Sequence, residues 1–373
     1  MSRPVFDPKE LIPVGSYPPA SHRGLAGAPK YDRPVTPREN LKLYFSGKKP
    51  YWLPYVGMAS IDVLNFRPRI HPDNVATHLV IDGEGPMVYE QNPAIGWFGL
   101  EWVFVPQVGG ATVKPGKPAV TDICDWRNQI TMPDLDAMDW EAAARDDLAM
   151  ADPNKVLAFF GMEGNYLRLC SMMGVCEALV AMLEEPEAVC EFFEAYTDFR
   201  IKVVEKVAKY YRPDVFVDGD DVCSSDGLFF SPAIYRELIK PFEMKLGKAI
   251  TDSGMILEHH ICGKCDAILP DLIERGTTIW QMAQVMNDLP ADKTQYGDKL
   301  LFHGGWDSTG IHNDENATEE QVRAEVRRCI DSYGADGHFM LFPVIIGDPA
   351  GTMNRKRAWA SDECRKYSEK LFR

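Results

Sequence analysis

The sequence predicts an α/β protein folded as a TIM (β/α)8 barrel, with an irregular N-terminal arm and a lid or insertion region. The main observation is that short apolar runs alternate with helical patterns from residue 139 onward, which indicates parallel strands. The length of 373 residues and the 45% hydrophobic content suit a single barrel of this class. A doubly wound open sheet is the alternative, but no Gly-x-Gly-x-x-Gly follows a predicted strand.

We divide the chain into an irregular arm, residues 1–35, and a barrel domain, residues 36–373. The arm is rich in Pro and Gly and has no clean hydrophobic period. The barrel domain opens with Thr36-Pro37-Arg38-Glu39-Asn40, which places Thr as the N-cap, Pro in the first turn and Glu in the capping-box position of a helix. Tyr51–Val56 is the candidate first strand.

Residues 61–135 consist of short apolar runs separated by turn residues. Within them, Trp97–Val105 has the composition of strands or of a hairpin. We interpret this section as the lid or insertion, because it lacks the regular strand–helix rhythm.

The regular part of the chain follows. Its predicted strands are Val156–Phe160, Asp214–Val217, Met255–His259, Thr278–Gln281, Leu300–His303 and His338–Phe342. Its predicted helices are Trp140–Met150, residues 165–183, residues 186–211, Ser231–Ser253, Asp266–Arg275 and Thr318–Tyr333.

Charge and cysteine content limit the class of protein. The formal net charge of −15 argues against a nucleic-acid partner and against an anionic membrane surface. Nine Cys without a repeating framework indicate free thiols in a reducing compartment. The first residues lack the pattern of a signal peptide, and no run of 18 apolar residues is present. We therefore expect a cytoplasmic protein.

Polar side chains collect where the predicted strands end. Because parallel barrel strands all end at one face, these groups should converge on one mouth. They are Glu163, then Asp218, Asp220 and Asp221, then His260 and Cys262, then Gln281, and finally His303, Trp306 and Asp307.

The segment Glu258–Cys265 holds two His and two Cys in eight residues. The His-x-Cys pair, His260 and Cys262, brings an imidazole and a thiolate close enough to bind one zinc ion. The alternative is a buried His and a small apolar Cys at a packed strand end. Cys265 should begin the next helix and face away, and His259 should point opposite to His260 as a core or interface histidine.

Two other segments at strand ends each have a functional and a structural interpretation. Asp218-Gly219-Asp220-Asp221 places three carboxylates together, which raises at least one pKa and suits a general acid or a metal-linked base. The alternative is a turn-forming Asp cluster. Gly304-Gly305-Trp306-Asp307 allows the backbone to approach a ligand, or forms a tight turn with Asp307 or Ser308 as an N-cap.

At these residues the chain resembles the uroporphyrinogen decarboxylase superfamily, a barrel fold that also contains corrinoid-dependent methyltransferases. The resemblance extends from about residue 36 onward. The matching pieces are Thr36–Asn40, Asp214–Asp221, Ser231-Pro232 with Pro241-Phe242, His260–Gly263, Gly304–Asp307 and Pro349–Asn354.

Two branches of this superfamily compete. True decarboxylases carry Arg-Gln-Ala-Gly-Arg after the first strand, to bind the carboxylates of their substrate, whereas this chain has Tyr51–Met58 there, without Arg. The methyltransferase branch binds zinc through His-x-Cys and a later Cys. His260 and Cys262 match the first two ligands, but Ile345 stands in place of the third.

The candidates to replace that missing ligand are Glu163, Asp220, Asp221 and Cys223. Zinc accepts carboxylate as well as thiolate. A mixed site of His, Cys and carboxylate is harder than the standard one and favours an oxygen substrate over a thiol.

The resemblance therefore implies the methyltransferase component of an O-demethylase. Such a protein moves a methyl group from an aryl methyl ether to the cobalt(I) of a corrinoid held by a partner protein. We expect zinc bound by His260, Cys262 and Cys223, and expect a homodimer. The expected catalytic residues are His260, Asp220, Asp221 and Glu163, and the expected substrate-binding residues are Trp97, Trp102, Trp306 and Asp307. A tetrapyrrole decarboxylase and a non-catalytic corrinoid- or tetrapyrrole-binding scaffold are the alternatives.

Overall fold

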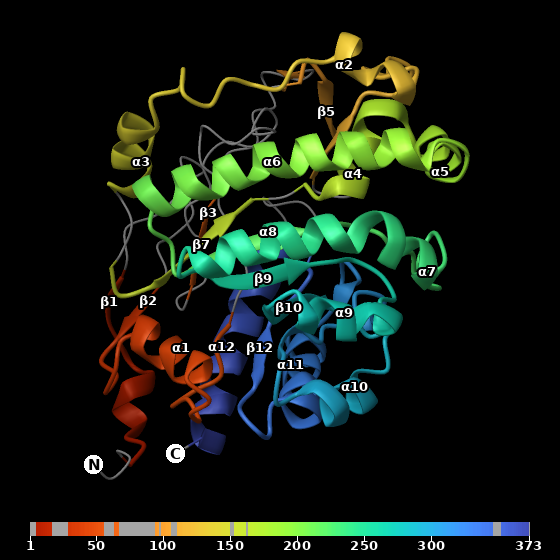
Figure 1. The fold of residues 1–373 in the computed structure, drawn as a ribbon. Coiled ribbons are helices and arrows are strands. Elements are labelled where there is room, and N and C mark those ends of the chain that lie inside the picture. The colour runs from red at the N-terminus through yellow and green to blue at the C-terminus, as the bar shows by residue number, and fades with distance from the viewer. Residues whose placement is uncertain are drawn as a thin grey trace.

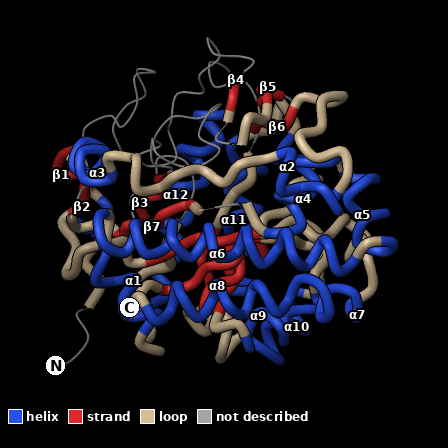
Figure 2. The backbone as a smooth tube through the Cα atoms, turned by 45° about the horizontal axis from the view of Figure 1, so that its top comes forward, coloured by secondary structure: helices blue, strands red, loops and turns tan. Residues whose placement is uncertain are grey.

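The structure is a computed structural model. It describes residues 5–16, 29–55, 63–66, 94–96, 98–105, 110–149, 153–161, 163–345 and 352–372. Strands lie at the centre of the molecule and helices surround them (Figures 1 and 2).

The central element is a curled parallel sheet of seven strands in the order β3-β7-β8-β9-β10-β11-β12. The strands are β3 (Val63–Phe66), β7 (Val156–Phe160), β8 (Val215–Gly219), β9 (Ile256–His260), β10 (Thr277–Ala283), β11 (Leu301–Gly304) and β12 (Phe339–Leu341). The strands follow one another across this sheet in their order along the chain, with β4, β5 and β6 of a separate sheet falling between β3 and β7. Strands in sequential order are what β/α repeats produce. The parallel pairing predicted from the sequence is confirmed.

The predicted first strand makes one contact with the edge of the sheet. Tyr55, in the predicted first strand, forms an isolated parallel bridge with Leu341 of β12. Within the described residues no ladder joins Tyr55 to β3, and residues 56–62 between them lie outside the described ranges. The fold is thus α/β with a curled parallel sheet, and the eight-stranded barrel stays a prediction.

Helices surround the sheet (Figures 1 and 2). They are α1 (Pro37–Phe45), α2 (Trp126–Gln129), α3 (Trp140–Leu148), α4 (Asn165–Met173), α5 (Val175–Glu184), α6 (Pro186–Tyr210), α7 (Pro232–Ile234), α8 (Lys240–Asp252), α9 (Leu269–Glu274), α10 (Leu289–Tyr296), α11 (Glu319–Tyr333) and α12 (Met353–Phe372). In Figure 1, α6 and α8 run side by side along β9, and these two helices contact each other.

Capping explains where several of these helices begin. Thr36 caps α1 and Thr318 caps α11, and each forms the full capping box with the residue three positions later. The helix predicted over residues 165–183 is instead two helices, α4 and α5, because Gly174 adopts a φ of 105°. Among the described helices no single one is long and apolar enough to cross a membrane, and α4 with α5 passes that test only as a pair bent by 114°.

The sequence analysis missed α10 and α12. Within α10 only Leu289 and Asp292 are buried, so there is little apolar periodicity to detect. Within α12 the buried side chains include Lys356, Arg365 and Glu369, whose charges conceal the buried face. Both helices are therefore held by tertiary contacts that the hydrophobic pattern does not reveal.

The N-terminal arm has more regular structure than the sequence indicates. It contains a short 3-10 helix, η1 (Pro8–Leu11), and an antiparallel pair of strands, β1 (Pro13–Ser16) and β2 (Pro29–Tyr31). The arm contacts α12, because Arg365 donates to the carbonyl of Leu11 at 3.1 Å.

The predicted lid region contains a separate antiparallel sheet of three strands, β4 (Ala94–Ile95), β5 (Glu101–Val105) and β6 (Gly110–Val113). The strand interpretation of Trp97–Val105 is confirmed by β5, which pairs with β4 and β6, both outside that range. Most of residues 61–93 lie outside the described ranges.

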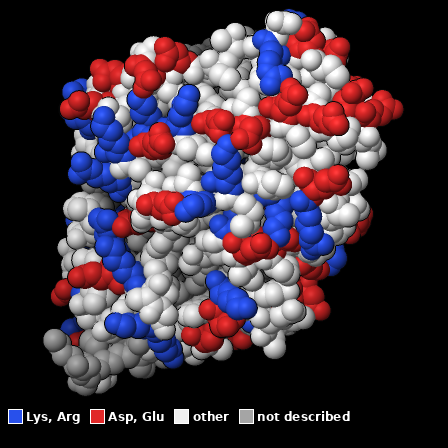
Figure 3. Space-filling model, viewed as in Figure 1, with Lys and Arg blue, Asp and Glu red and all other residues white. Residues whose placement is uncertain are grey.

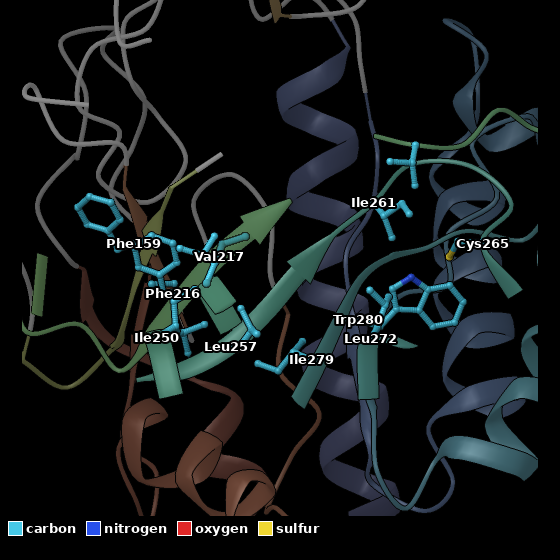
Figure 4. Close-up of a cluster of buried hydrophobic side chains, with 14 of the residues drawn as sticks. Phe159, Phe216, Val217, Ile250, Leu257, Ile261, Cys265, Leu272, Ile279 and Trp280 are labelled. Carbon is cyan, nitrogen blue, oxygen red and sulfur yellow. The ribbon is translucent and has the colours of Figure 1, made fainter. Parts of the chain in front are cut away.

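The space between the sheet and α6, α8 and α9 is filled mainly by apolar side chains, some of which Figure 4 shows. One buried ion cluster interrupts them. Asp218 of β8 is bound by both Arg200 and Arg275, and Arg275 also contacts the ring of His259 on β9 at 2.6 Å. Burial opposes ionisation, but Arg200 and Arg275 together hold the pKa of Asp218 well below its usual range. The prediction that His259 is a core histidine is confirmed.

We expect Arg275→Met to lower the free energy of unfolding by about 3–5 kcal/mol, because it leaves Asp218 buried with half of its compensating charge. Lys248→Ala is the matched control. It breaks the exposed pair with Asp252, whose side chains are 75% and 62% exposed, and should change stability by less than about 1 kcal/mol. Denaturant unfolding of the two variants measures the difference, and superimposable curves would contradict this account.

A second prediction concerns pH. Asp292, in the first turn of α10, is buried, and its Oδ2 has no hydrogen-bond partner among the described residues. Burial, with the charges of Asp266 and Asp288, raises its pKa from 3.8 to about 6. The folded state therefore keeps this proton while the unfolded state releases it, so this group lowers stability as pH rises from 3.8 through about 6.

Asp292→Asn should remove the loss of stability that the ionisation of Asp292 causes as pH rises. The variant should unfold at a higher temperature than the parent at pH 7.5, and the difference should shrink at pH 4. Thermal unfolding at several pH values tests this. A stabilisation of the same size at both pH values would show that the charge is not its cause.

Candidate metal and active site

Three potential metal ligands meet where β8 and β9 end. The ligand atoms of Asp221, His260 and Cys262 all lie within 4.8 Å of one another. The Sγ of Cys262 is 3.5 Å from Nε2 of His260. All three side chains are half-buried, so they are fixed in place and still reachable from outside. Elsewhere in the described ranges no other group of His, Cys, Asp or Glu meets this criterion.

The loop that carries Cys262 is held from two sides. On the side of β8, Oδ1 of Asp221 accepts the N–H of Cys262 at 2.8 Å, and the carbonyl of Ser224 accepts the N–H of Lys264 at 2.8 Å. On the side of β10, Oε1 of Gln284 accepts the N–H of Gly263 at 2.7 Å. These bonds position the thiol before any ligand arrives.

Glycine is required at position 263 for two reasons. Its φ is +98°, and a Cβ there would lie 2.4 Å from the carbonyl oxygen of Ser224. The close approach of the two loops therefore depends on a residue without a side chain.

A buried hydrogen-bonded group lies behind His260. Nδ1 of His260 is 2.6 Å from Oε1 of Gln281, whose Nε2 donates to Glu258. Glu258 is also 2.6 Å from Nδ1 of His303. Glu258, Gln281 and His303 are all buried. Of this group the sequence analysis singled out Gln281 and His303 at strand ends but missed Glu258. Period-two alternation on β9 could have found it, because Glu258 and His260 share a face.

The donor set fits zinc. It offers a carboxylate oxygen, an imidazole nitrogen and a thiol sulfur, which are the atoms that zinc binds in proteins. Burial, together with the charge of Asp221, raises the pKa of the Cys262 thiol to about 12. A divalent cation at this position would reverse that preference, because a coordinated thiol loses its proton.

Asp221, rather than Asp220, joins the ligand group. Both oxygens of Asp220 accept backbone N–H groups at the start of α4, from Tyr166 at 2.8 Å and Leu167 at 2.7 Å. Burial, followed by the charge of Glu243, raises the pKa of Asp220, while these two N–H groups oppose the rise. The geometry makes Asp220 a helix cap, and its predicted catalytic role stays a prediction.

Two other candidate replacements for the missing ligand, Glu163 and Cys223, are not members of this three-residue group. Glu163 pairs with Arg168 at 3.0 Å and accepts from the hydroxyl of Ser171 at 3.4 Å. Cys223 is buried, and it does not belong to the three-residue group. Among the four candidates, Asp221 is the one whose ligand atom lies within 4.8 Å of those of His260 and Cys262, and Ile345 is buried.

Cys265 lies away from the ligand group. It is fully buried beside Trp280 and Leu272 (Figure 4) and caps the short helix η6 (Asp266–Ile268). The prediction that Cys265 begins the next helix is confirmed.

Two of the predicted substrate-binding residues, Trp306 and Asp307, have hydrogen-bond partners, whereas the buried Nε1 of Trp102 has none among the described residues. Trp306 is buried and donates from Nε1 to Asn313 at 3.1 Å. Asp307 accepts from the N–H of Thr309 at 2.9 Å, which is the turn interpretation of this segment. Trp102 is buried on β5, and Trp97 lies outside the described residues. Phe98 packs edge-on against Tyr196 and Phe199 as a core residue. Substrate binding by the three Trp and by Asp307 stays a prediction.

Comparison with known proteins identifies the family. The sequence profile of the family described as uroporphyrinogen decarboxylase (URO-D) matches residues 114–342. The chain belongs to the uroporphyrinogen decarboxylase family. This match confirms the predicted superfamily, although it does not select a reaction within it.

A solved structure agrees with the fold of this URO-D family protein. A methyltransferase from Methanosarcina mazei has a TM-score of 0.64 and 16% sequence identity, and the match covers 89% of this chain and 99% of that one. D-Psicose 3-epimerase with D-tagatose from Clostridium cellulolyticum H10 has a TM-score of 0.35 and 10% identity over 62% of this chain and 84% of that one, too low to support an argument. No curated protein matches the sequence.

Substitutions of two neighbouring aspartates of this URO-D family protein should have different effects on zinc affinity and on stability. Asp221→Asn keeps an oxygen for the N–H of Cys262 but removes the anionic ligand, so zinc affinity should fall by more than the roughly 10–100-fold typical of outer-shell changes. Asp220→Asn is the matched control. It loses one of two capping bonds, which should lower stability by about 1 kcal/mol and leave zinc affinity unchanged. Zinc per chain after dialysis and thermal unfolding of the metal-free variants separate the two outcomes.

Proposed function

We propose that this protein is a methyltransferase that moves a methyl group from an aryl methyl ether to the cobalt(I) of a corrinoid carried by a partner protein. The observation that carries the proposal is the convergence of Asp221, His260 and Cys262 within 4.8 Å where β8 and β9 end. Ligand sets at this end of parallel strands are typical of enzymes in barrel-like folds. A methyltransferase with the same fold supports the choice of reaction class.

In the proposed reaction, the corrinoid and the metal site have different roles. Cobalt(I) is the nucleophile, and the described residues at the site need not supply one. Zinc held by His260, Cys262 and Asp221 would supply a Lewis acid for the ether oxygen and so make the phenolate a better leaving group. Because Asp221 takes the place of a second thiolate, the donor set is harder, which favours an oxygen substrate over a sulfur one.

The partner must reach the ligand group. All three ligands are half-buried, so a planar corrinoid at the mouth could approach them. Such a partner has to leave after each transfer, which requires a small and transient interface.

On the face shown in Figure 3, acidic and basic side chains are intermingled. With a net charge of −15, this distribution is unlike the basic surface that nucleic acids require.

The test combines metal analysis with an assay. The purified protein should contain about one zinc per chain. With a cobalt(I) corrinoid it should convert a methoxybenzoate or dimethoxybenzene to the phenol and form methylcobalt, measured by absorbance. His260→Ala should abolish turnover and lower the zinc content, whereas Lys248→Ala, on an exposed helix surface, should keep both.

Three results would contradict the proposed methyl transfer and favour another function. Stoichiometric zinc without methyl transfer would reject the methyltransferase and keep the metal. Loss of carboxyl groups from a porphyrinogen, without any metal, would favour the decarboxylase that gives the family its name. Unchanged corrinoid affinity without any turnover, in both parent and His260→Ala, would favour the non-catalytic scaffold.

A further inference from the structure

We propose that Gln281 is a positioning residue that fixes the tautomer of His260 and so presents Nε2 to the metal. The inference rests on the proposed role of His260 as a ligand, and it goes further by assigning a task to a side chain that does not touch the metal. It follows from the donor and acceptor types of four buried or half-buried groups on β9, β10 and β11.

The position of Gln281 follows from strand register. On β10 it pairs with His260 of β9 on one side and with His303 of β11 on the other. Only 3% of Gln281 is exposed, so protein groups determine its hydrogen bonds. Its side chain contacts both neighbouring histidines and Glu258.

Glu258 determines which way the amide of Gln281 points. The Nε2 group of Gln281 donates to Oε1 of Glu258. The opposite orientation would place the amide oxygen against a carboxyl oxygen, which pairs two acceptors in a buried site and is strongly unfavourable. Oε1 of Gln281 therefore faces His260.

The amide orientation then determines the tautomer. Oε1 of Gln281 can only accept, so Nδ1 of His260, at 2.6 Å, carries the proton. In the neutral imidazole the lone pair is then on Nε2. That nitrogen is the one 3.5 Å from Sγ of Cys262, inside the ligand group.

Gln281 should raise the metal affinity of the site, because His260 would otherwise often carry its proton on Nε2. Neutral imidazole in water prefers the proton on Nε2, which is where the metal must bind. Without the carbonyl of Gln281, His260 would populate that form and would have to change tautomer before coordination. Partners of this kind typically contribute 10–100-fold to metal affinity.

His303 reinforces the arrangement. Its Nδ1 lies 2.6 Å from Oε1 of Glu258 and 3.1 Å from Nε2 of Gln281. Since Gln281 donates through Nε2, the proton of His303 is directed to Glu258, which accepts from both neighbours. The resulting chain of hydrogen bonds runs from His303 through Glu258 and Gln281 to His260, and it leaves Gln281 one allowed orientation.

The test compares Gln281→Leu with Thr277→Val. Thr277 is also buried on β10, at its other end, and its hydroxyl has no partner among the described residues, so Thr277→Val controls for loss of a polar group from this strand. Zinc affinity, measured by competition with a chromophoric chelator, should fall 10–100-fold in Gln281→Leu and change less than about twofold in Thr277→Val.

A second readout does not depend on metal or on turnover. In the metal-free protein labelled with nitrogen-15 histidine, the eight His give distinct ring signals, and His260 is identified by its absence from His260→Ala. The parent should show Nδ1 protonated and Nε2 unprotonated for His260. Gln281→Leu should shift His260 toward the opposite tautomer, whereas Thr277→Val should not. Gln281→Met, which is closer in shape, replaces Gln281→Leu if that variant does not fold.

The outcomes separate the two proposals. A tautomer shift and weaker zinc binding in the Gln281 variants, in a protein that transfers no methyl group, would reject the proposed reaction and support the role of Gln281. An unchanged tautomer of His260 in a folded Gln281 variant would overturn the inference, whatever the activity.

Discussion

The register of the parallel sheet decides where the chemistry of this protein lies. Gly219 of β8 pairs with His260 of β9, His260 pairs with Gln281 of β10, and Gln281 pairs with His303 of β11. One row across four strands therefore contains a candidate ligand and its supporting groups. Gly219 makes the row possible, because a Cβ there would lie 2.5 Å from the carbonyl oxygen of His260. A shift of one residue would turn every side chain of a strand to the other face.

The same register separates two kinds of polar group. Residues that alternate along β8 and β9 face opposite sides of the sheet, so Asp218 and His259 lie in the ion cluster with Arg275. Glu258 and His260 face the other way, toward Gln281. Ionisable groups that are adjacent in sequence, such as Glu258, His259 and His260, thus lie on opposite faces, with the ion cluster on one face and the candidate site on the other.

The resemblance to the methyltransferase branch implies a third zinc ligand in addition to His260 and Cys262. Ile345 occupies the position expected for that ligand, whereas Asp221 brings a carboxylate to His260 and Cys262 from the neighbouring loop. The hydrogen bond from the N–H of Cys262 to Asp221 explains how the two loops are joined. In the proposed function, a carboxylate supplied from a different strand makes the donor set harder without changing the fold.

The sequence by itself determined the elements with strong local signals. The capping box at Thr36, the buried runs of β7 and β9, and the His-x-Cys segment were all readable, because each depends on residues close together in the chain. The break at Gly174 was not, because a single Gly inside a helical pattern does not by itself end a helix. Helix α12 was not, because its buried face includes Lys356, Arg365 and Glu369.

Only the tertiary structure shows which of Asp220, Asp221, Glu163 and Cys223 forms a group with His260 and Cys262, whereas the sequence could only place all four at the same mouth. Side-chain direction and loop packing determine which side chains meet. The turn after β8 directs Asp220 to the start of α4 and Asp221 to Cys262. Adjacent residues with the same side chain have different partners, and that difference exists only once β8, β9 and α4 are packed together.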